Sequence, residues 1–105
     1  MTLDESASNM EYLEIFYSLD NTDSNNAHFP AYKSVKIYNP GGKKAMLEGI
    51  TYHDQLAIVQ LSWVPITISG VNITRGTERY MNLADDQVPH ISTQTKIKIY
   101  RVTGM

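Results

Sequence analysis

The chain has 105 residues, of which 42% are hydrophobic, and it carries a net charge of −2 and no cysteine. This length and composition predict one globular domain with a single core rather than a disordered chain. The missing cysteines exclude a disulfide framework, thiol catalysis and cysteine-based zinc sites. No stretch resembles a signal peptide or reaches the roughly 18 apolar residues of a membrane span, so we expect a cytoplasmic protein.

The charge is unevenly distributed along the chain. Residues 1–30 carry six acidic and no basic side chains, whereas residues 31–105 carry nine basic and five acidic ones. Such asymmetry can steer a charged partner toward one part of a protein. The simpler interpretation is that the two parts lie in adjacent strands and neutralise each other.

The first strand is predicted at residues 10–19, after a polar and flexible N-terminal segment over residues 1–9. Apolar and polar side chains alternate along this strand, which is typical of a strand with one buried face. Leu13, Ile15, Tyr17 and Leu19 fall on one face, and Tyr12, Glu14, Phe16 and Ser18 fall on the other. The Asx-rich stretch that follows, residues 20–26, predicts a solvated loop, because it lacks the spacing and the bidentate glutamate of an EF-hand calcium loop.

Two further strands are predicted on either side of the turn Asn39–Gly42, whose Asn-Pro-Gly-Gly sequence favours a chain reversal. They cover residues 32–38 and residues 45–52. The residues expected to share a face are Val35 and Ile37 in the earlier strand, and Met46, Ile50 and Tyr52 in the later one. The two glycines of the turn do not form a phosphate loop, because the required Lys-Ser/Thr spacing and the following helix are absent from the sequence.

Residues 57–76 form the densest apolar stretch of the chain and contain its only tryptophan, Trp63. The period-two pattern and the β-branched residues predict a strand at 57–64, which is bent at Pro65 and resumes beyond it. We expect Trp63 to be a core residue, because it is in phase with Leu61 at the apolar end of this strand.

Three more strands are predicted after Gly70. They cover residues 71–73, 78–83 and 91–102. In the last of them, Lys96 and Lys98 are expected to face solvent on the side opposite Ile97 and Ile99. Seven short strands, separated by turns that contain Gly, Pro and Asn, indicate an all-β fold, which we expect to be a single antiparallel β-sandwich.

Several short motifs in the chain occur in the order of a known family of sandwich domains. They are Val35–Ala45, Leu61–Trp63, Ile73–Gly76 and Tyr80–Leu83. In this order the motifs, over about residues 10–102, resemble the immunoglobulin-like accessory domains of many bacterial and archaeal proteins. No cysteine pair brackets Trp63, so the resemblance is not to an antibody-type domain. It implies an immunoglobulin-like sandwich that acts as a spacer or a binding domain and has no shared catalytic residues.

Residue types that carry catalysis or bind metals are scattered in the sequence. The three histidines, His28, His53 and His90, have no spacing that suits a metal site. The neighbours Asp85 and Asp86 would point to opposite sides of an extended chain, which makes them a poor acid–base couple. The sequence also has no nucleophile elbow or oxyanion-hole motif. We therefore predict no catalytic residue, no metal and no cofactor.

Single-stranded nucleic acid is the main alternative ligand. Basic and aromatic residues are interleaved over residues 32–44 and 96–101, as in small barrels that bind single strands. The pI of about 5.8, and the common use of lysine to protect edge strands, make nucleic acid an unlikely partner. Sugar binding through exposed tyrosines is a further alternative, and a small virion or phage accessory protein would be built from the same kind of β-domain.

The sequence thus favours a non-enzymatic protein-interaction or accessory module without membrane contact. Its partner is expected to be another protein, including a second copy of this chain, bound by an edge strand and the neighbouring loops. Lys96 and Lys98 would protect the C-terminal strand from pairing. We expect the first strand to lie at or near the contact, because it presents Tyr12, Phe16 and Tyr17 in a chain with few other large aromatic residues.

Overall fold

The computed structural model describes residues 2–19, 28–29, 31–53, 58–83, 89–92 and 96–105. In these ranges the chain forms nine strands and a single turn of 3₁₀ helix, Ala7–Asn9, and all strand pairs are antiparallel. The prediction of an all-β antiparallel fold is therefore confirmed. Two of the strands have only two residues each and were not expected from the sequence. Among the described residues, no helix has the length and apolar character needed to cross a membrane.

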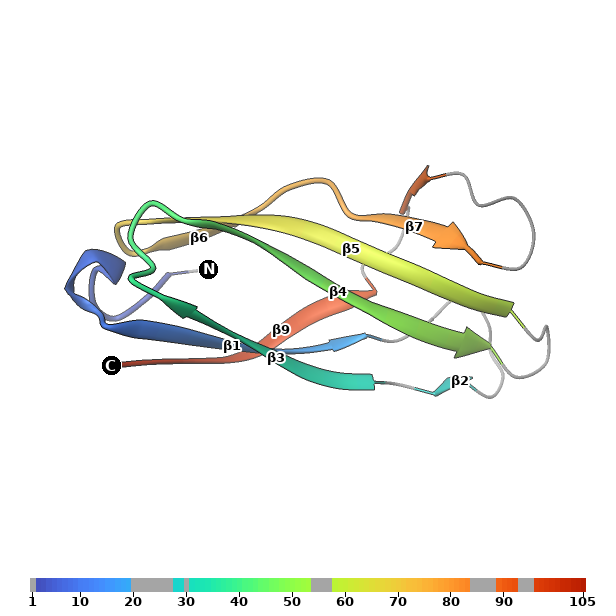
Figure 1. Ribbon diagram of the computed structural model, residues 1–105, viewed down its shortest axis with the longest axis horizontal. Helices are drawn as coiled ribbons and strands as arrows, with labels where there is room; N and C mark the ends of the chain where they lie inside the picture. The colour runs from blue at the N-terminus through green and yellow to red at the C-terminus, as the bar shows by residue number, and fades with distance from the viewer. Residues whose placement is uncertain (1, 20–27, 30, 54–57, 84–88, 93–95) are drawn as a thin grey trace.

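The strands form a small and a large sheet that lie one above the other (Figure 1). The small sheet contains β1 (Tyr12–Leu19), β3 (Ala31–Tyr38) and β9 (Ile97–Gly104), in the order β3-β1-β9. The large sheet contains β2 (His28–Phe29), β4 (Lys44–His53), β5 (Ile58–Ser69), β6 (Asn72–Arg75), β7 (Arg79–Asn82) and β8 (His90–Ile91). Its order is β2-β4-β5-β7-β8, and β6 also pairs with β5.

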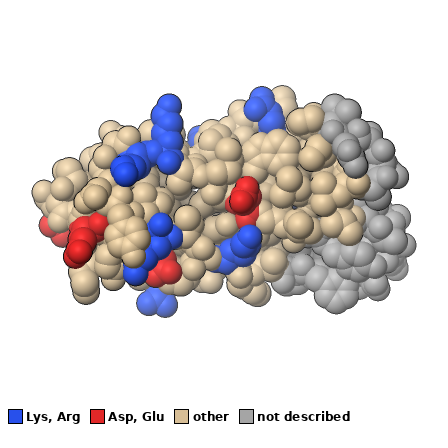
Figure 2. Space-filling model, in the orientation of Figure 1, with Lys and Arg blue, Asp and Glu red and all other residues tan. Residues whose placement is uncertain are grey.

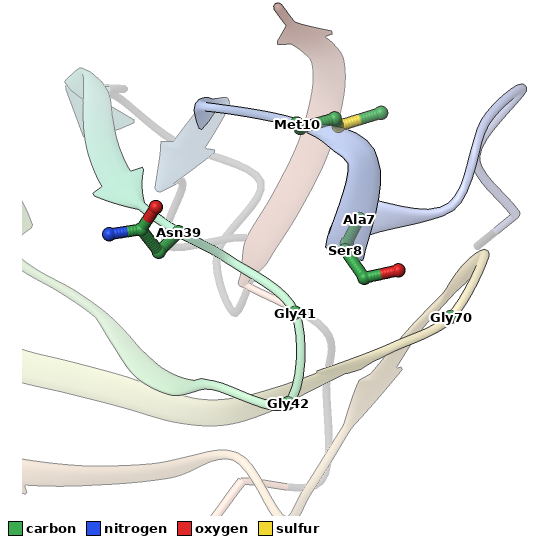
Figure 3. Close-up of a pocket in the computed structure, with 7 residues that line it drawn as sticks. All are labelled: Ala7, Ser8, Met10, Asn39, Gly41, Gly42 and Gly70. Carbon is green, nitrogen blue, oxygen red and sulfur yellow. The ribbon is translucent and has the colours of Figure 1, made fainter.

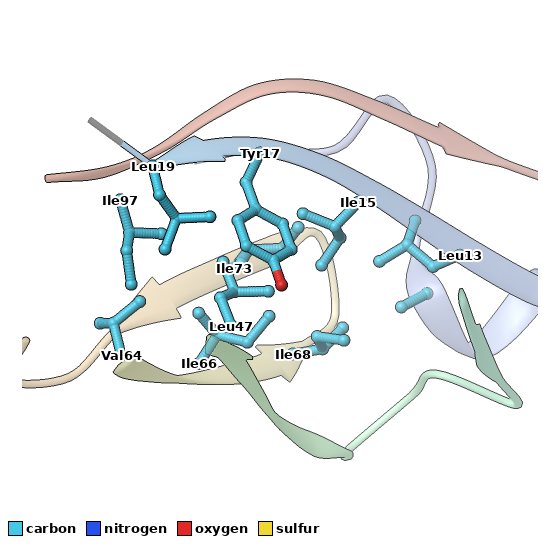
Figure 4. Packing of buried hydrophobic residues seen from close by; sticks show 11 residues of the cluster. Leu13, Ile15, Tyr17, Leu19, Leu47, Val64, Ile66, Ile68, Ile73 and Ile97 are labelled. Carbon is cyan, nitrogen blue, oxygen red and sulfur yellow. The ribbon is translucent and has the colours of Figure 1, made fainter. Parts of the chain in front are cut away.

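The hydrophobic core fills the space between the two sheets (Figure 4). The small sheet contributes Leu13, Ile15, Tyr17, Leu19 and Ile97, and the large sheet contributes Leu47, Val64, Ile66, Ile68 and Ile73. The alternation predicted for the first strand is confirmed, and the structure shows that the face with Leu13 and Ile15 is the buried one. The sheets approach closely at Gly49, where an added Cβ would lie 2.8 Å from the δ-carbons of Leu19. Each buried Leu or Ile side chain contributes about 1.5–3 kcal/mol to folding.

The prediction that Trp63 is a core residue is wrong. The buried face of β5 is the opposite one, and Trp63 lies on the outer face with its side chain only half-buried. Apolar side chains occur on both faces of this strand, so its alternation did not show which face is inside. The inner face even includes the polar residues Gln60 and Ser62. The position of the partner sheet, rather than the size of the ring, decides which face of β5 is buried.

The bend expected at Pro65 does not interrupt β5, which runs through this residue to Ser69. Proline has no N–H and is tolerated in a sheet only where the neighbouring strand is absent or irregular. Beside Pro65 the neighbouring chain passes from β6 to β7, and the Pro65 carbonyl accepts a hydrogen bond from Gly76 N at 2.8 Å. Pro65 therefore lacks its N–H at a place where the ladder on that side of β5 is interrupted.

The last predicted strand, residues 91–102, is divided between the two sheets. β8 ends at Ile91 in the large sheet, and β9 begins at Ile97 in the small one. Lys98 is exposed, as expected, but the prediction that Lys96 faces solvent is wrong, because this residue is only 2% exposed. The change of sheet brings Lys96 into the interior, where its Nζ donates a hydrogen bond to Gln60 Oε1 at 3.0 Å.

The N-terminal segment, which the sequence predicted to be flexible, lies against the turn between β5 and β6. Leu3 N donates a hydrogen bond to Val71 O at 2.6 Å, and Ala7 N donates one to Gly70 O at 2.7 Å. Ala7 is fully buried. These bonds join the segment to the turn between β5 and β6, and the flexibility expected of residues 1–9 stays a prediction.

Candidate interaction surface

β1 is the middle strand of the small sheet and not one of its edges. It pairs with β3 along its whole length on one side and, from Leu13 to Leu19, with β9 on the other. Its backbone N–H and C=O groups are therefore used within the sheet, and the edges of this sheet are β3 and β9. The expected contact by an edge strand does not hold for β1, because the alternation of one strand does not encode its neighbours. A partner can meet β1 only through its outward side chains.

The outer side of the small sheet carries a group of aromatic side chains that we call the aromatic face. It consists of Tyr12 and Phe16 from β1, Tyr32 and Tyr38 from β3, and Tyr100 from β9. Three of these rings are largely open to solvent, with exposed fractions of 70% for Tyr32, 59% for Tyr38 and 55% for Tyr100. The sequence singled out Tyr12 and Phe16, and strand pairing adds the other three rings.

One end of the aromatic face is built around a lysine. Tyr12 lies opposite Tyr38 in the β1–β3 ladder, and their ring centroids are 6.2 Å apart. The Nζ of Lys36, two residues before Tyr38 on the same side of β3, lies 4.2 Å from the centre of the Tyr12 ring and 5.7 Å from that of Tyr38. A cation at this distance is attracted to the electron-rich face of the ring. Lys36 therefore holds both rings on the surface of the sheet.

A β-bulge in β9 determines which side chains lie at the other end of the aromatic face. The pairing of β9 with β1 shifts where Phe16 faces Arg101 and Tyr17 faces Ile99, so Tyr100 has no partner in the ladder. Tyr100 and Arg101 are consequently both exposed, although they are adjacent in sequence. Both of them flank Phe16, whose ring centre is 6.4 Å from that of Tyr100 and 5.4 Å from the Arg101 guanidinium carbon. The sequence marks the bulge only by a change of parity, since Ile97 and Ile99 share one parity and Val102 has the other.

The third contact within the face joins its two edge strands. The Tyr32 ring of β3 meets the Tyr100 ring of β9 edge-on, with centroids 6.2 Å apart and an angle of 81° between the planes. Edge-to-face pairs of this kind contribute about 0.5–1.5 kcal/mol beyond the burial of their area. These two rings therefore extend the face across β1, which lies between them.

The charges on the outer side of the small sheet are mainly positive. Lys36 on β3 and Lys98 and Arg101 on β9 share this side with one carboxylate, that of Glu14 on β1. Figure 2 shows that, over the side of the molecule it presents, basic side chains are interspersed with acidic ones. In that view the basic side chains form no continuous band.

Tyr17, the third residue expected at the partner contact, is a core residue with 3% exposure. Its hydroxyl donates a hydrogen bond to Glu48 O at 2.8 Å and accepts one from Glu48 N at 3.2 Å. In the antiparallel β4–β5 ladder, every second residue of β4 directs its N–H and C=O away from β5. Glu48 is such a residue, and the Tyr17 hydroxyl forms hydrogen bonds with both of these groups. Figure 4 shows the ring among the core residues with its oxygen directed toward the large sheet. Tyr17 therefore links the two sheets and does not belong to the aromatic face.

A pocket of about 280 Å³ lies at the end of the molecule where the N-terminal segment meets two turns (Figure 3). It is lined by Ala7, Ser8, Met10, Asn39, Gly41, Gly42 and Gly70. Asn39, Gly42 and Gly70 have positive φ angles, as tight turns require. The lining includes the Ser8 hydroxyl and the Asn39 amide but no charged side chain and no histidine.

Apart from the backbone pairing of His28 with His53, the residues considered for metal binding or catalysis are not brought together in the part of the chain that the structure describes. No group of three His, Asp or Glu residues there could hold a metal ion. The stretch 20–26 and the pair Asp85–Asp86 lie outside the described residues. His28 and His53, far apart in sequence, face each other in the ladder between β2 and β4. His90 stacks on Tyr80, with ring centroids 5.3 Å apart.

Comparison of the chain with protein-family models, with curated proteins and with solved structures gives no match. A function for this chain is therefore argued from its own geometry. The aromatic face is the feature that combines exposed apolar surface with ordered charged groups. It is our candidate site.

Proposed function

We propose that the chain is a non-enzymatic protein-interaction module and that the aromatic face is the surface that contacts its partner. The observation that supports this proposal is the group of five rings, contacted by Lys36 and Arg101, on the outer side of a three-stranded sheet. Tyrosine and arginine are enriched at the energetic centres of protein interfaces. Contiguous exposed apolar surface on a soluble domain also marks interaction sites.

A protein partner suits this geometry better than a single-stranded nucleic acid. Bases bind to such surfaces by stacking on ring faces that are open. Lys36 lies over the Tyr12 ring and Arg101 over the Phe16 ring, so these two rings are less open to a base than those of Tyr32, Tyr38 and Tyr100. The observation in favour of nucleic acid is the set of three cations on the same side of the sheet, and this ligand is our second candidate.

The fold behind this function is, in our proposal, an immunoglobulin-like sandwich in the broad sense of two antiparallel sheets around one core. Support comes from the short motifs that resemble accessory domains and from the two layers of strands. The strand order departs from that of constant-type immunoglobulin domains, in which the first strand lies at a sheet edge, because β1 here lies between β3 and β9. A spacer domain or a virion accessory protein would use the same surface.

The proposal is tested by comparing what the wild-type protein and a surface variant capture from the native source. The variant Tyr12→Ser/Phe16→Ser removes the two central rings of the face without touching the core residues of β1. We expect mass spectrometry to find a protein that is recovered by the wild type and is lost with this variant. Val71→Ser, in the exposed turn between β5 and β6, is the matched control and should recover the same protein.

Thermal melts of both variants separate a lost contact from a lost fold. If the double variant melts like the wild type and still recovers the partner, the contact lies elsewhere and the proposal is wrong. If it unfolds, the single changes Tyr32→Ser and Tyr100→Ser test the same face at rings that are more than half exposed.

A further inference from the structure

The outer side of the large sheet carries a second apolar surface, directed away from the aromatic face (Figure 1). We call it the Trp63 face. It consists of Met46 and Ile50 from β4, Leu61, Trp63 and Pro65 from β5, Met81 from β7 and Ile91 from β8. Three of its side chains are large, apolar and well exposed, at 45% for Met46, 56% for Ile50 and 63% for Ile91. A surface of this kind marks a contact with another molecule.

The register of the ladders places two opposite charges on either side of Trp63. Glu48 of β4 and Arg79 of β7 are both opposite Trp63 of β5, so the three residues form one row across the sheet. Both charged side chains are exposed. The next row, in the same order, is Ile50, Leu61 and Met81. The face therefore has an apolar column along β5, with an acid to one side and a base to the other.

We infer that the Trp63 face is the contact surface between two copies of this chain, related by a twofold axis that runs along β5. Such an axis lays β5 on β5, and β4 of one copy on β7 of the other. Glu48 of each copy then meets Arg79 of the other copy, and the two Trp63 side chains pack together on the axis. This arrangement is an isologous contact between aligned sheets, a common way for two β-sheets to pack.

The aromatic face lacks this complementarity. A twofold axis along β1 would lay β3 of one copy on β9 of the other, so that Lys36 meets Thr103 and Arg101 meets Ser34, with no opposite charges paired. It would also set the two copies of Glu14 against each other on the axis. Like charges in apposition cost several kcal/mol, so the charges favour the Trp63 face for a second copy and leave the aromatic face for a different partner.

A dimer of this form would present its two aromatic faces on opposite outer sides. Each dimer could then hold two partner molecules or two sites of one partner, and the second binding event would gain from the high effective concentration. This consequence rests on the proposed function, whereas the dimer itself does not. The molar mass tests the dimer and partner capture tests the proposed function, so a failure of the dimer can be told from a failure of the proposed function.

The first experiment measures the molar mass of the whole chain by sedimentation over a series of increasing concentrations. We expect a shift from 11.9 kDa to twice this mass. Because Trp63 is the only tryptophan, its fluorescence maximum should move to shorter wavelength over the same concentration range as its ring becomes buried. A mass of 11.9 kDa at every concentration, up to the millimolar range, would overturn the inference.

The second experiment exchanges the charges. Glu48→Arg and Arg79→Glu should each weaken the dimer at least about tenfold, since each places like charges in apposition, and the double variant should restore it. The backbone groups of Glu48 that bind Tyr17 are unchanged by these substitutions. Single variants that melt like the wild type and dimerise equally well would overturn the pairing, as would a double variant that stays monomeric.

The aromatic-face variant Tyr12→Ser/Phe16→Ser is the matched control and should dimerise as the wild type does. If it is folded and monomeric while the charge variants still dimerise, the copies meet through the aromatic face and the inference is wrong. Trp63→Ser should give a folded monomer, because its side chain lies on the outer face, and its melt is compared at concentrations where the wild type is also monomeric.

Discussion

At the scale of single residues, the hydroxyl of Tyr17 does what a wholly apolar core side chain could not. It satisfies both backbone groups of Glu48 from across the core. We predict that Tyr17→Phe keeps the packing of the ring but lowers the free energy of unfolding by about 1–3 kcal/mol, since it leaves a buried N–H and C=O with less than their full hydrogen bonding. Chemical denaturation measures this difference.

The matched change is Tyr12→Phe on the outer side of the same strand. Its hydroxyl makes only a long contact of 3.9 Å with the Met105 sulfur, so the unfolding free energy should change by no more than about 0.5 kcal/mol. Equal effects of the two changes would show that the Tyr17 hydroxyl does not stabilise the fold in this way.

The inward position of Tyr17 was not predicted, although polar Glu14 and Ser18 on the opposite face of β1 were a signal for it. The outward position of Trp63 could not be predicted, because β5 is apolar on both of its faces. Only part of the candidate site could likewise be found from the alternation of one strand. Tyr12 and Phe16 were identified from their shared parity in one strand, whereas Tyr32 and Tyr100 joined them only through the pairing of β3 and β9 with β1.

At the scale of elements, the start of β9 is fixed by the side chain of Glu78, which is only 9% exposed. Its two oxygens accept hydrogen bonds from Lys96 N at 3.0 Å and Ile97 N at 3.3 Å, and it pairs with Arg75 at 2.9 Å. Arg75 also donates to Ile97 O at 2.8 Å. These bonds hold the chain where it leaves the large sheet for the small one. This change of sheet was missed because no Gly or Pro interrupts residues 91–102, and the decisive contacts are distant in sequence.

We predict that Glu78→Ala lowers the free energy of unfolding by about 2–3 kcal/mol, because two backbone donors and an arginine lose a charged acceptor. Denaturant titration measures the loss. Glu5→Ala, at an exposed carboxylate, is the control and should change stability by no more than about 0.5 kcal/mol. If the two variants are equally stable, the contacts of the Glu78 side chain at the start of β9 do not stabilise the fold.

At the scale of the whole molecule, composition and turn chemistry were enough to predict an all-β antiparallel fold. The distribution of the strands between two sheets was not predictable, because period two marks the faces of a strand but not its neighbours. This distribution creates the two outer faces, one aromatic and basic, the other apolar with balanced charges. Both candidate contact surfaces therefore depend on the sheet topology, which cannot be predicted from any single stretch of the sequence.

The last prediction distinguishes the two candidate ligands of the aromatic face. A mixed-sequence, fluorescently labelled single strand of DNA should show no increase in anisotropy with micromolar protein at physiological salt. The reasons are that the chain is acidic overall, with a net charge of −2, and that Lys36 and Arg101 already lie against rings. Micromolar or tighter binding that weakens steeply as salt rises, and that is lost in Lys36→Met/Arg101→Met, would instead assign the face to nucleic acid, because each released counterion adds to the salt dependence. Lys43→Met, in the turn between β3 and β4, is the control that changes charge without changing the face.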